Sequence, residues 1–302
     1  MPEYSFQHRL EFRGYTIVEK FINSLPDVAL PGIARFFAFL VYHIIGIRKK
    51  VARENLKLAF PNKSDRWHKR TVYFSYLHFA MVILEFMSMN KWSHRKLASR
   101  MRKVDIDKFL DSVRTGKGGI IVSGHFGNWE IGMGYLHLKN VRSSVIQQRQ
   151  QNRLVNEKMK LLRQKWGMEI IVPRGAVLNC LQALKKKRIV ALLGDQDAGE
   201  RGIVVPFLGQ PSSTHIGGAM IHLKSGVPLF LGTCTRVNAH KFDFEIQPIP
   251  TDASGKVTEA KLKEVIEKYS LAMEKHIRKH PEQYFWLHRR WKSKDKIVSS
   301  SS

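Results

Sequence analysis

The hydrophobic pattern of the chain changes character near residue 117. Before this position the apolar residues form long stretches typical of helices, at residues 28–47 and 65–92. After it, short apolar runs that end in small or polar residues alternate with longer amphipathic segments. The pattern therefore predicts a helical first part followed by alternating strands and helices.

The second part of the chain indicates the fold class. We expect strands at residues 118–124, 141–149, 168–173, 188–197, 227–236 and 241–249. We expect helices at residues 125–138 (after a turn), 152–167, 176–187, 217–226 and 258–280. Alternation of this kind favours an α/β fold with right-handed crossovers, in which helices flank a mostly parallel or mixed central sheet.

The same pattern suggests the domain organisation. The chain has 302 residues, 43% of them hydrophobic, which is enough for one large domain or two small ones. We expect an N-terminal segment at residues 1–50 with a membrane-associated helix, a single α/β domain at 51–295, and a disordered, serine-ended tail at 296–302.

The apolar stretch at residues 28–47, VALPGIARFFAFLVYHIIGI, has the length of a membrane-spanning helix. It carries Pro31, Arg35 and His43, and the basic run RKKVAR follows it directly. The stretch can span the bilayer with the basic run on the cytoplasmic side, lie in the interface as a basic-edged helix, or form a buried core helix. The first 20 residues are too charged for a secretory signal.

Charge narrows the choice of partner. The chain has 51 Lys and Arg residues against 25 Asp and Glu residues, so its formal net charge is +26. Such a field favours an anionic membrane surface, an acidic protein or nucleic acid, although a well-solvated basic surface is the plain alternative. The basic residues are spread along the chain and form no recognised nucleic-acid motif, so we expect no nucleic-acid partner. Only two cysteines, Cys180 and Cys234, are present, which favours a reducing compartment.

The segment IVSGHFGNWEI at residues 121–131 places His125 and Glu130 just after a predicted buried strand. Gly124 and Gly127 permit a tight turn that brings the carboxylate back onto the imidazole ring. A carboxylate on one ring nitrogen fixes the tautomer and raises the basicity of the other nitrogen, as a general base for a hydroxyl requires. The plain alternative is a polar histidine at a strand end beside an acid at a helix start. The neighbouring Asn128 either holds the turn or donates to a substrate oxygen.

Asp195 and Asp197 follow another predicted strand, in the segment GDQD. Ligands of open α/β sheets bind beyond the carboxyl ends of the strands. We therefore expect both carboxylates close to His125.

Several common catalytic motifs are missing from the sequence. It has no G-x-S-x-G nucleophile, no glycine-rich phosphate loop, and no His, Cys or Glu group at metal-ligand spacing. We therefore expect no metal and no cofactor. A base without a protein nucleophile indicates direct transfer, in which a substrate hydroxyl attacks an already activated group.

Four segments carry a family resemblance: GHFGNWE, GDQDAGERGIVVPFLG, PSSTHIGGAMIHLKSGVPLF and PEQYFWLHRRWK. In this order they resemble the bacterial lipid A biosynthesis (late) acyltransferase family, of the lauroyl/myristoyl type, over roughly residues 25–292. The segment RENLKLAFPNKSDR is similar to the part of the family that follows its membrane helix. The resemblance implies a glycerolipid-acyltransferase-like fold. It also implies an enzyme at the cytoplasmic face of the bacterial inner membrane.

The resemblance also implies an activity. Members transfer a fatty acyl chain from acyl carrier protein, or sometimes acyl-CoA, to a hydroxyl of a membrane glycolipid. The family's HxxxxE/D motif falls on His125 as the base and Glu130 as the acid that orients it. The family's arginine after its second strand falls on Arg149, although Gln-Arg-Gln replaces the usual Tyr-Arg-Pro context here.

Further polar positions of the family align with Arg174, Asp195 and Asp197. With Asn128 and Arg149 they make up the expected substrate-binding residues. We expect Arg149, Arg174 or backbone N–H groups near Gly127 to stabilise the oxyanion. A structural ion pair between Arg174 and either aspartate is the alternative.

Two other functions stay open at this point. The chain can be an acyl-CoA-dependent acyltransferase for another bacterial glycolipid, such as a mannoside, or for an aminolipid. It can also be a non-catalytic lipid-binding protein. The expected partners are acyl carrier protein, a membrane glycolipid acceptor and an anionic membrane surface.

Two aromatic regions also allow more than one interpretation. The aromatic helix at residues 72–87 lines an acyl groove or packs in the core. Near the C terminus, a basic cluster adjoins two tryptophans and predicts a membrane or phosphate contact, or else a solvated patch. This cluster consists of Arg289, Arg290 and Lys292 beside Trp286 and Trp291.

Overall fold

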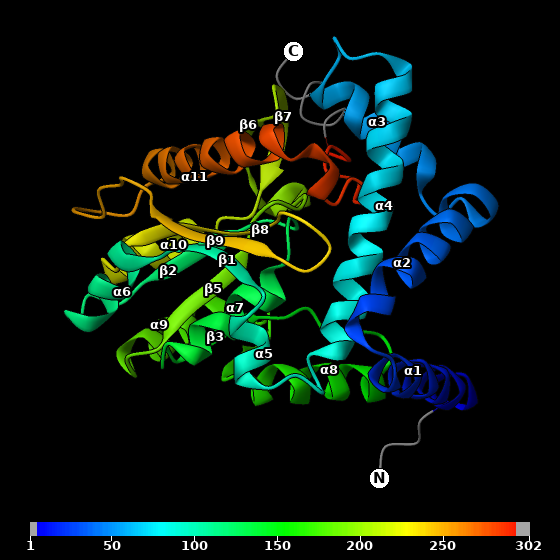
Figure 1. Ribbon diagram of the computed structural model, residues 1–302. Helices are drawn as coiled ribbons and strands as arrows, with labels where there is room; N and C mark the ends of the chain where they lie inside the picture. Colours follow the sequence, from blue (N-terminus) through cyan, green and yellow to red (C-terminus); the bar gives the residue numbers. More distant parts are fainter. Residues whose placement is uncertain (1–4, 294–302) are drawn as a thin grey trace.

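A seven-stranded mixed sheet forms the centre of the computed structural model, which describes residues 5–293 (Figure 1). Its strand order is β1-β9-β8-β2-β5-β3-β4. The strands β8, β2, β5, β3 and β4 run parallel, whereas β9 is antiparallel to β8 and parallel to β1. The fold class expected from the hydrophobic pattern is therefore confirmed.

The strands of this sheet are β1 Met101–Asp105, β2 Ile120–Ser123, β3 Ser143–Ile146, β4 Met168–Ile171, β5 Ile189–Leu193, β8 Leu229–Arg236 and β9 Phe242–Pro248. A separate hairpin pairs β6 Ile203–Phe207 with β7 Gln210–Thr214. All six strands expected from the sequence are present. The pattern does not predict β6, β7 or β1, and β1 lacks an apolar run because this edge strand, MRKVD, is largely charged, as edge strands often are.

Helices cover both faces of the sheet. One face carries α5 His94–Ala98, α6 Asp107–Arg114, α7 Trp129–Leu138 and α8 Arg153–Lys165. The other carries α9 Ala176–Lys185, α10 Gly217–Ser225 and α11 Glu259–Lys279. Side chains alternate along β2, so Ile120 and Val122 pack under α9–α11 while Ile121 packs on the α7 side. This alternation explains why the strand is apolar throughout.

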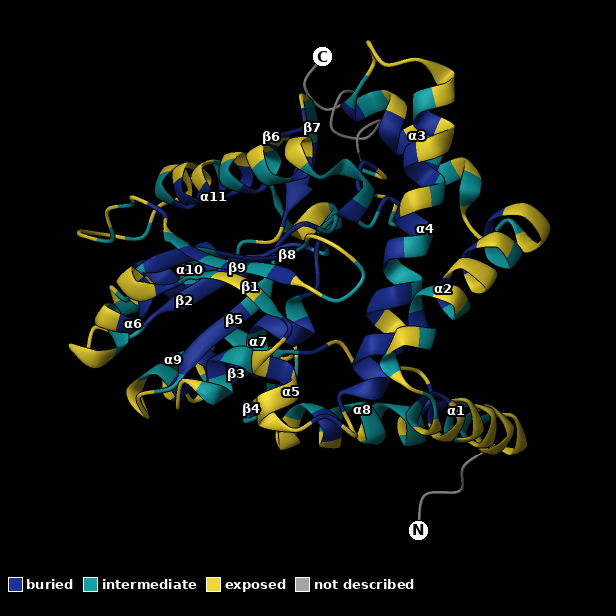
Figure 2. Ribbon diagram, in the orientation of Figure 1, coloured by how far each residue is buried: buried dark blue, intermediate teal, exposed yellow. Residues whose placement is uncertain are grey.

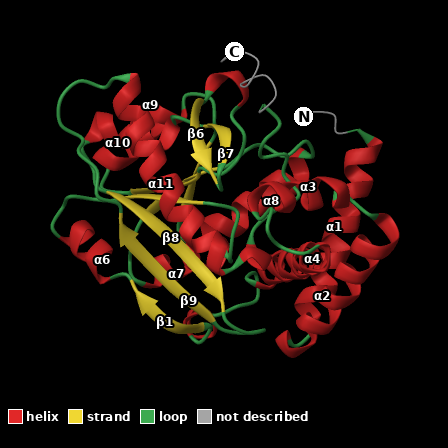
Figure 3. Ribbon diagram, turned by 90° about the horizontal axis from the view of Figure 1, so that it is seen from above, coloured by secondary structure: helices red, strands yellow, loops and turns green. Residues whose placement is uncertain are grey.

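The N-terminal helices gather beside the sheet, as the two views of Figure 1 and Figure 3 both show. They are α1 Phe6–Ser24, α2 Leu30–Phe39, α3 Lys49–Ala59 and α4 Asp65–Ser88. α2 continues into a π-helical segment, η2 Leu40–Ile45. Ser64 caps α4 by accepting a hydrogen bond from the N–H of Trp67. α4 also contacts the loop after β2, because His78 Nε2 lies 2.9 Å from the carbonyl oxygen of Gly127.

The stretch at residues 28–47, which we expect to associate with a membrane, packs against the rest of the protein with only one of its faces. Ala34 and Ala38 are buried in the contact with α4, whereas Phe36 and Phe39 are exposed. By length and composition, Asp27–Ile45 and Asp65–Ser88 could each cross a membrane. The first of these is mostly uncovered and the second is mostly buried (Figure 2). The aromatic helix α4 thus serves largely as a core helix.

The segment after α11, residues 280–293, crosses the carboxyl end of the sheet. The N–H of Phe285 donates to the carbonyl of His125, and Asn55 of α3 donates to the carbonyls of Trp286 and His288. The expected membrane contact of this segment needs correction. Trp286, Arg290 and Trp291 are buried, and Arg290 donates to the Ser213 carbonyl and the Thr214 hydroxyl. Only Arg289 and Lys292 of the cluster are exposed.

The predicted tail at residues 296–302 lies outside the described residues, and the predicted division at residue 50 stays a prediction.

Candidate active site

His125 lies two residues beyond the end of β2, on the loop that leads into α7. Gly127 shapes this loop with a φ of +57°, and a Cβ at this position would approach the Cys234 carbonyl oxygen to 2.2 Å. Only glycine fits there. The loop therefore holds the His125 ring at the carboxyl edge of the sheet, where its side chain is 23% exposed.

Asp195 is the carboxylate that contacts the His125 ring. It follows β5, the strand next to β2, and is 2% exposed. Its Oδ1 lies 2.8 Å from Nδ1 of His125, and its Oδ2 accepts a hydrogen bond of 2.9 Å from the His125 backbone N–H. Because a carboxylate only accepts, it places the ring hydrogen on Nδ1 and leaves the Nε2 lone pair toward the pocket. The two strand ends thus meet as the sequence predicts.

The surroundings of this pair raise the proton affinity of the ring. Burial by itself lowers the pKa of His125, but the charge and hydrogen bond of Asp195, helped by the charge of Glu130, outweigh it and raise this pKa. Burial likewise opposes ionisation of Asp195, yet His125 and the Arg290 charge hold the pKa of Asp195 below its usual value. Nearby, burial and then the Asp195 charge raise the pKa of the Tyr284 hydroxyl. The result is a basic imidazole backed by an ionised carboxylate.

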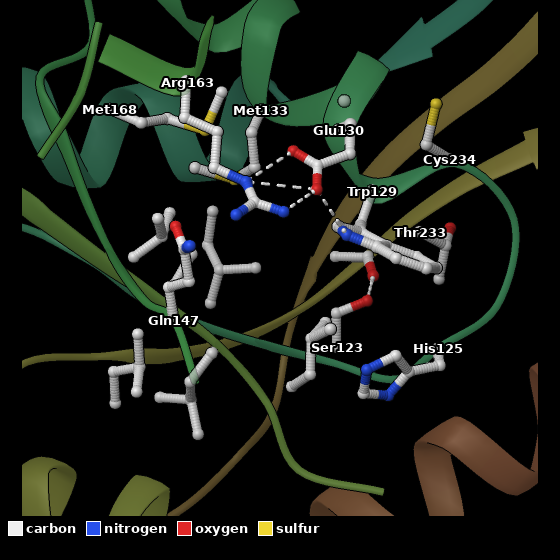
Figure 4. A pocket seen from close by; sticks show the side chains of 18 of the residues that line it. Ser123, His125, Trp129, Glu130, Met133, Gln147, Arg163, Met168, Thr233 and Cys234 are labelled. Atoms are coloured by element: carbon white, nitrogen blue, oxygen red, sulfur yellow. Dashed lines mark hydrogen bonds and ion pairs between the residues drawn. The ribbon is translucent and has the colours of Figure 1, made fainter. Parts of the chain in front are cut away.

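Glu130 does not occupy the place that the sequence predicts. Its carboxylate pairs with Arg163 of α8 and accepts a hydrogen bond from the Trp129 indole, and these contacts are drawn in Figure 4. The prediction that Glu130 contacts the His125 ring is therefore wrong, because Asp195 makes this contact instead. Glu130 sits in the first turn of α7, which directs its side chain toward α8, so it acts on His125 only through its charge.

Asn128 has a structural position. It is 0% exposed; its Oδ1 accepts from the N–H of Ile131 as the cap of α7, and its Nδ2 donates to Glu85 of α4. Glu85 is itself paired with Arg236. Because its amide oxygen and its amide nitrogen both have partners, Asn128 holds the turn. The structure does not support the alternative prediction that Asn128 donates to a substrate oxygen.

A pocket of about 220 Å³ opens beside His125 and extends under the sheet toward α7 and α8. Figure 4 shows it from close by. Most of its lining is apolar and includes Ile121, Met133, Val145, Met168, Ala191 and Phe244. The ion pair between Glu130 and Arg163 forms a polar part of the pocket wall. The shape and lining suit an apolar chain whose reactive end reaches the histidine.

Three side chains with a hydroxyl or thiol line this pocket, Ser123, Thr233 and Cys234, and two of them are held or suppressed. The Ser123 hydroxyl donates to the Gly232 carbonyl at 2.7 Å. Burial raises the pKa of the Cys234 thiol far above its usual value, so the reactive thiolate is suppressed. Within residues 5–293, no hydrogen bond joins any of the three side chains to His125, which favours a reaction without a protein nucleophile.

Gln196 contacts the second ring nitrogen of His125. Its Nε2 is 3.5 Å from Nε2 of His125, and the residue is half-buried between Asp195 and Asp197. The backbone N–H groups near Gly127 are already occupied, because Phe126, Gly127 and Asn128 all donate to main-chain carbonyls. The expected oxyanion role of these backbone groups is therefore corrected.

Arg149 and Arg174 are exposed on loops after β3 and β4, and neither lines the pocket. Arg149 nevertheless lies at the pocket edge, because Gln148 and Gln150 on either side of it are lining residues. Asp197 is likewise engaged elsewhere, because it accepts hydrogen bonds from the Gly199 N–H and from Ser293. The alternative of an ion pair between Arg174 and either aspartate is not realised in residues 5–293. Of the expected substrate-binding residues, only Asp195 contacts His125.

The sequence pattern does not predict Gln196 and Arg163 as site residues. Gln196 lies in the GDQD segment, directly between Asp195 and Asp197, and is its one uncharged polar side chain. Arg163 lies in a helix with many cations, KMKLLRQK, where nothing distinguishes it from its neighbours. No group of three or more His, Cys, Asp or Glu side chains is placed to share a metal ion within the described part of the chain.

Comparison with known proteins gives one family. The family model described as bacterial lipid A biosynthesis acyltransferase matches residues 5–293. The chain is 26% identical to the lipid A biosynthesis lauroyltransferase of Escherichia coli K12 over 264 residues, which cover 84% of the chain and 82% of the relative. It is 24% identical to the lipid A biosynthesis palmitoleoyltransferase of the same organism over 258 residues, covering 82% and 79%.

A second group of relatives is named for another glycolipid. The phosphatidylinositol mannoside acyltransferase of Mycobacterium tuberculosis is 23% identical over 207 residues, which cover 66% of the chain and 63% of the relative. The two Escherichia coli relatives are named for lipid A biosynthesis and differ in the acyl group, whereas the Mycobacterium tuberculosis relative is named for phosphatidylinositol mannoside.

Proposed function

The chain belongs to the bacterial lipid A biosynthesis acyltransferase family, and we propose that it transfers a fatty acyl chain from an acyl carrier protein thioester to a hydroxyl of a lipid A precursor. It is an O-acyltransferase, as the names of its relatives indicate. The observation that carries the proposal is the His125–Asp195 pair at the mouth of an apolar pocket.

The proposed reaction is a direct transfer. The acyl chain lies in the pocket with its thioester beside Nε2 of His125. The acceptor oxygen attacks the carbonyl carbon while Nε2 takes the hydroxyl proton, and Asp195 stabilises the imidazolium that forms. The tetrahedral intermediate then collapses: the carbon–sulfur bond breaks, an ester forms, and the imidazolium returns its proton to the leaving thiolate.

Gln196 supplies the oxyanion contact in this mechanism. An acceptor oxygen bonded to Nε2 of His125 lies next to the carbonyl it attacks, so a donor 3.5 Å from that nitrogen reaches the developing negative charge. The amide N–H of Gln196 has no other partner in residues 5–293. It can therefore turn from the resting histidine to the oxyanion.

The location follows from the same proposal. The enzyme is membrane-associated, as its lipid substrates require, and we place it at the cytoplasmic face of the inner membrane, where acyl carrier protein is available. The net charge of +26 supports an acidic carrier protein and an anionic membrane surface as partners. No cofactor takes part in this mechanism.

The test uses the full chain in detergent with an acyl carrier protein thioester and a lipid A precursor. Mass spectrometry should find one added acyl group with the wild type and with His94→Ala, an exposed histidine used as control, and none with His125→Ala. Transfer by His125→Ala at the wild-type rate would contradict the proposed base. Thioester hydrolysis without transfer would contradict the acceptor, and acyl-CoA in place of the carrier thioester tests the donor.

A further inference from the structure

An apolar stripe runs along the outer side of α1. Its residues are Phe6, Leu10, Ile17 and Phe21, which are 82%, 60%, 68% and 58% exposed. At 3.6 residues per turn these four positions fall within an arc of about 60°. Figure 2 shows the exposed positions along this helix. Large apolar side chains gathered in one stripe indicate a contact surface, whereas scattered ones need no explanation.

Positive charges line one edge of the α1 stripe. Arg9, Arg13 and Lys20 are exposed and fall within about 60° of it on one side. The two acids of the helix are bound elsewhere: Glu11 accepts a hydrogen bond from Asn152, and Glu19 is buried in an ion pair with Lys158. The outer side of α1 is therefore apolar with a cationic border.

The inner side of α1 is fixed along the body of the protein. Asn152 donates to the His8 carbonyl, Lys158 pairs with Glu19, and Ile22 is buried between α1 and α4. These contacts occur along most of the helix length, and Figure 1 shows α1 lying beside α8. The helix is thus held with its stripe facing outward, and it cannot cross a bilayer end to end.

We propose that α1 is an in-plane membrane helix whose stripe inserts into an anionic bilayer surface while Arg9, Arg13 and Lys20 contact the lipid phosphates. An apolar face with a cationic edge is the pattern of interfacial helices. A second copy of the chain fits less well, because pairing two stripes would bring the cations of both copies together. This contact goes beyond the proposed function, because it can exist whichever lipid is acylated.

The position of α1 connects the bilayer to the active site. α1 rests on α8, and α8 carries Arg163, which pairs with Glu130 in the pocket wall. The exposed face of α2 and η2, with Phe36, Phe39 and Ile44, adds a second apolar surface near the N terminus. A bilayer contacting α1 therefore touches a helix that packs directly on α8, one side of the acyl pocket.

Vesicle flotation tests the proposal without any substrate. The double variant Ile17→Glu/Phe21→Glu should bind vesicles of phosphatidylglycerol and phosphatidylethanolamine about tenfold or more weakly than the wild type, because two side chains no longer leave water. Leu178→Glu/Leu271→Glu is the matched control, with two exposed leucines on α9 and α11, at 62% and 54% exposure. Equal binding of the two double variants would overturn the proposal.

The second experiment locates α1 directly. Cys180 and Cys234 are buried and burial raises the pKa of both thiols, so a single added cysteine can be labelled. A nitrobenzoxadiazole label on Phe21→Cys should shift its emission to the blue on adding anionic vesicles, and the label on Leu271→Cys should not. Vesicle binding with no shift at position 21 would show that another surface docks, and would overturn the proposal.

The cationic border has its own test. Arg9→Gln/Arg13→Gln/Lys20→Gln should lose the preference for anionic over phosphatidylcholine vesicles, and added salt should have the same effect on the wild type. An unchanged lipid preference would contradict the role of these cations. Since these measurements need no acyl transfer, their failure and the failure of the proposed reaction are distinguishable.

Discussion

Gln196 is the residue whose proposed role is easiest to separate from the others at the site. Replacing it with leucine should lower kcat about 10²- to 10³-fold, the usual cost of losing one oxyanion donor. The pH dependence should stay unchanged, because Asp195 and Glu130, which raise the pKa of His125, remain in place. Steady-state kinetics of Gln196→Leu across the pH range measure both effects.

Gln182→Leu, an exposed glutamine on α9, is the control for this substitution. A wild-type kcat for Gln196→Leu would remove Gln196 from the mechanism. A change in KM with kcat intact would assign it to substrate binding instead.

At the residue scale, the sequence predicts the meeting of His125 and Asp195 but not their pairing. Both follow buried strands, and parallel strand ends share one edge of the sheet. The choice between Glu130 and Asp195 as the partner depends on β2 and β5 being neighbours, with Ser123 opposite Leu193. Local spacing in the sequence does not reveal the strand order. Glu130 is nearer to His125 in the sequence and is therefore the more obvious candidate, but it is not the acid that contacts the ring.

At the scale of elements, the start of α7 is the junction that holds the loop carrying His125. Asn128 caps the helix and also donates to the buried Glu85 of α4. Asn128→Ala should lower the free energy of unfolding by about 2–4 kcal/mol, because it removes a cap and a hydrogen bond to a buried carboxylate. Urea unfolding measures this loss.

Ser64→Ala is the matched comparison, since Ser64 caps the exposed start of α4 and has no buried partner. It should cost only about 1 kcal/mol. Equal losses for the two variants would contradict a special role of the Asn128–Glu85 contact.

Elements with a strong hydrophobic period are predictable from the sequence, and those without it are not. Helices α8, α9 and α11 and the six central strands follow their apolar patterns. The β6–β7 hairpin turns at Leu208 and Gly209, both with positive φ, and leucine is an uncommon residue in such a turn. The buried Arg290 and Trp286 read as surface residues in the sequence because charge and aromatic content do not show which way a loop faces.

At the scale of the whole molecule, the net charge of +26 should govern the encounter with the donor. An acidic carrier protein is attracted by a basic surface, and salt screens this attraction. Raising the salt concentration from low to high should therefore lower kcat/KM for the carrier-linked donor by about tenfold or more. The decrease should be smaller for the less charged acyl-CoA.

Salt titrations with both donors at equal chain length measure this difference. Equal salt dependence would contradict a carrier-protein docking surface, and a strong preference for acyl-CoA at all salt concentrations would contradict the proposed donor.

The pH dependence of kcat/KM in wild type, Asp195→Asn and Glu130→Gln tests most directly the claim that Asp195 holds His125 as the base. The base must be neutral to act, so the wild-type activity should rise with pH through an apparent pKa above the ordinary histidine value of 6.5. In Asp195→Asn, burial is largely unopposed and lowers the pKa of His125. The rise should therefore move to lower pH, and the limiting rate should fall about 10²- to 10⁴-fold.

Glu130→Gln should shift the profile in the same direction but by less, because Glu130 acts on His125 only through its charge. The account is contradicted if Asp195→Asn keeps the wild-type profile, or if Glu130→Gln shifts it further than Asp195→Asn does.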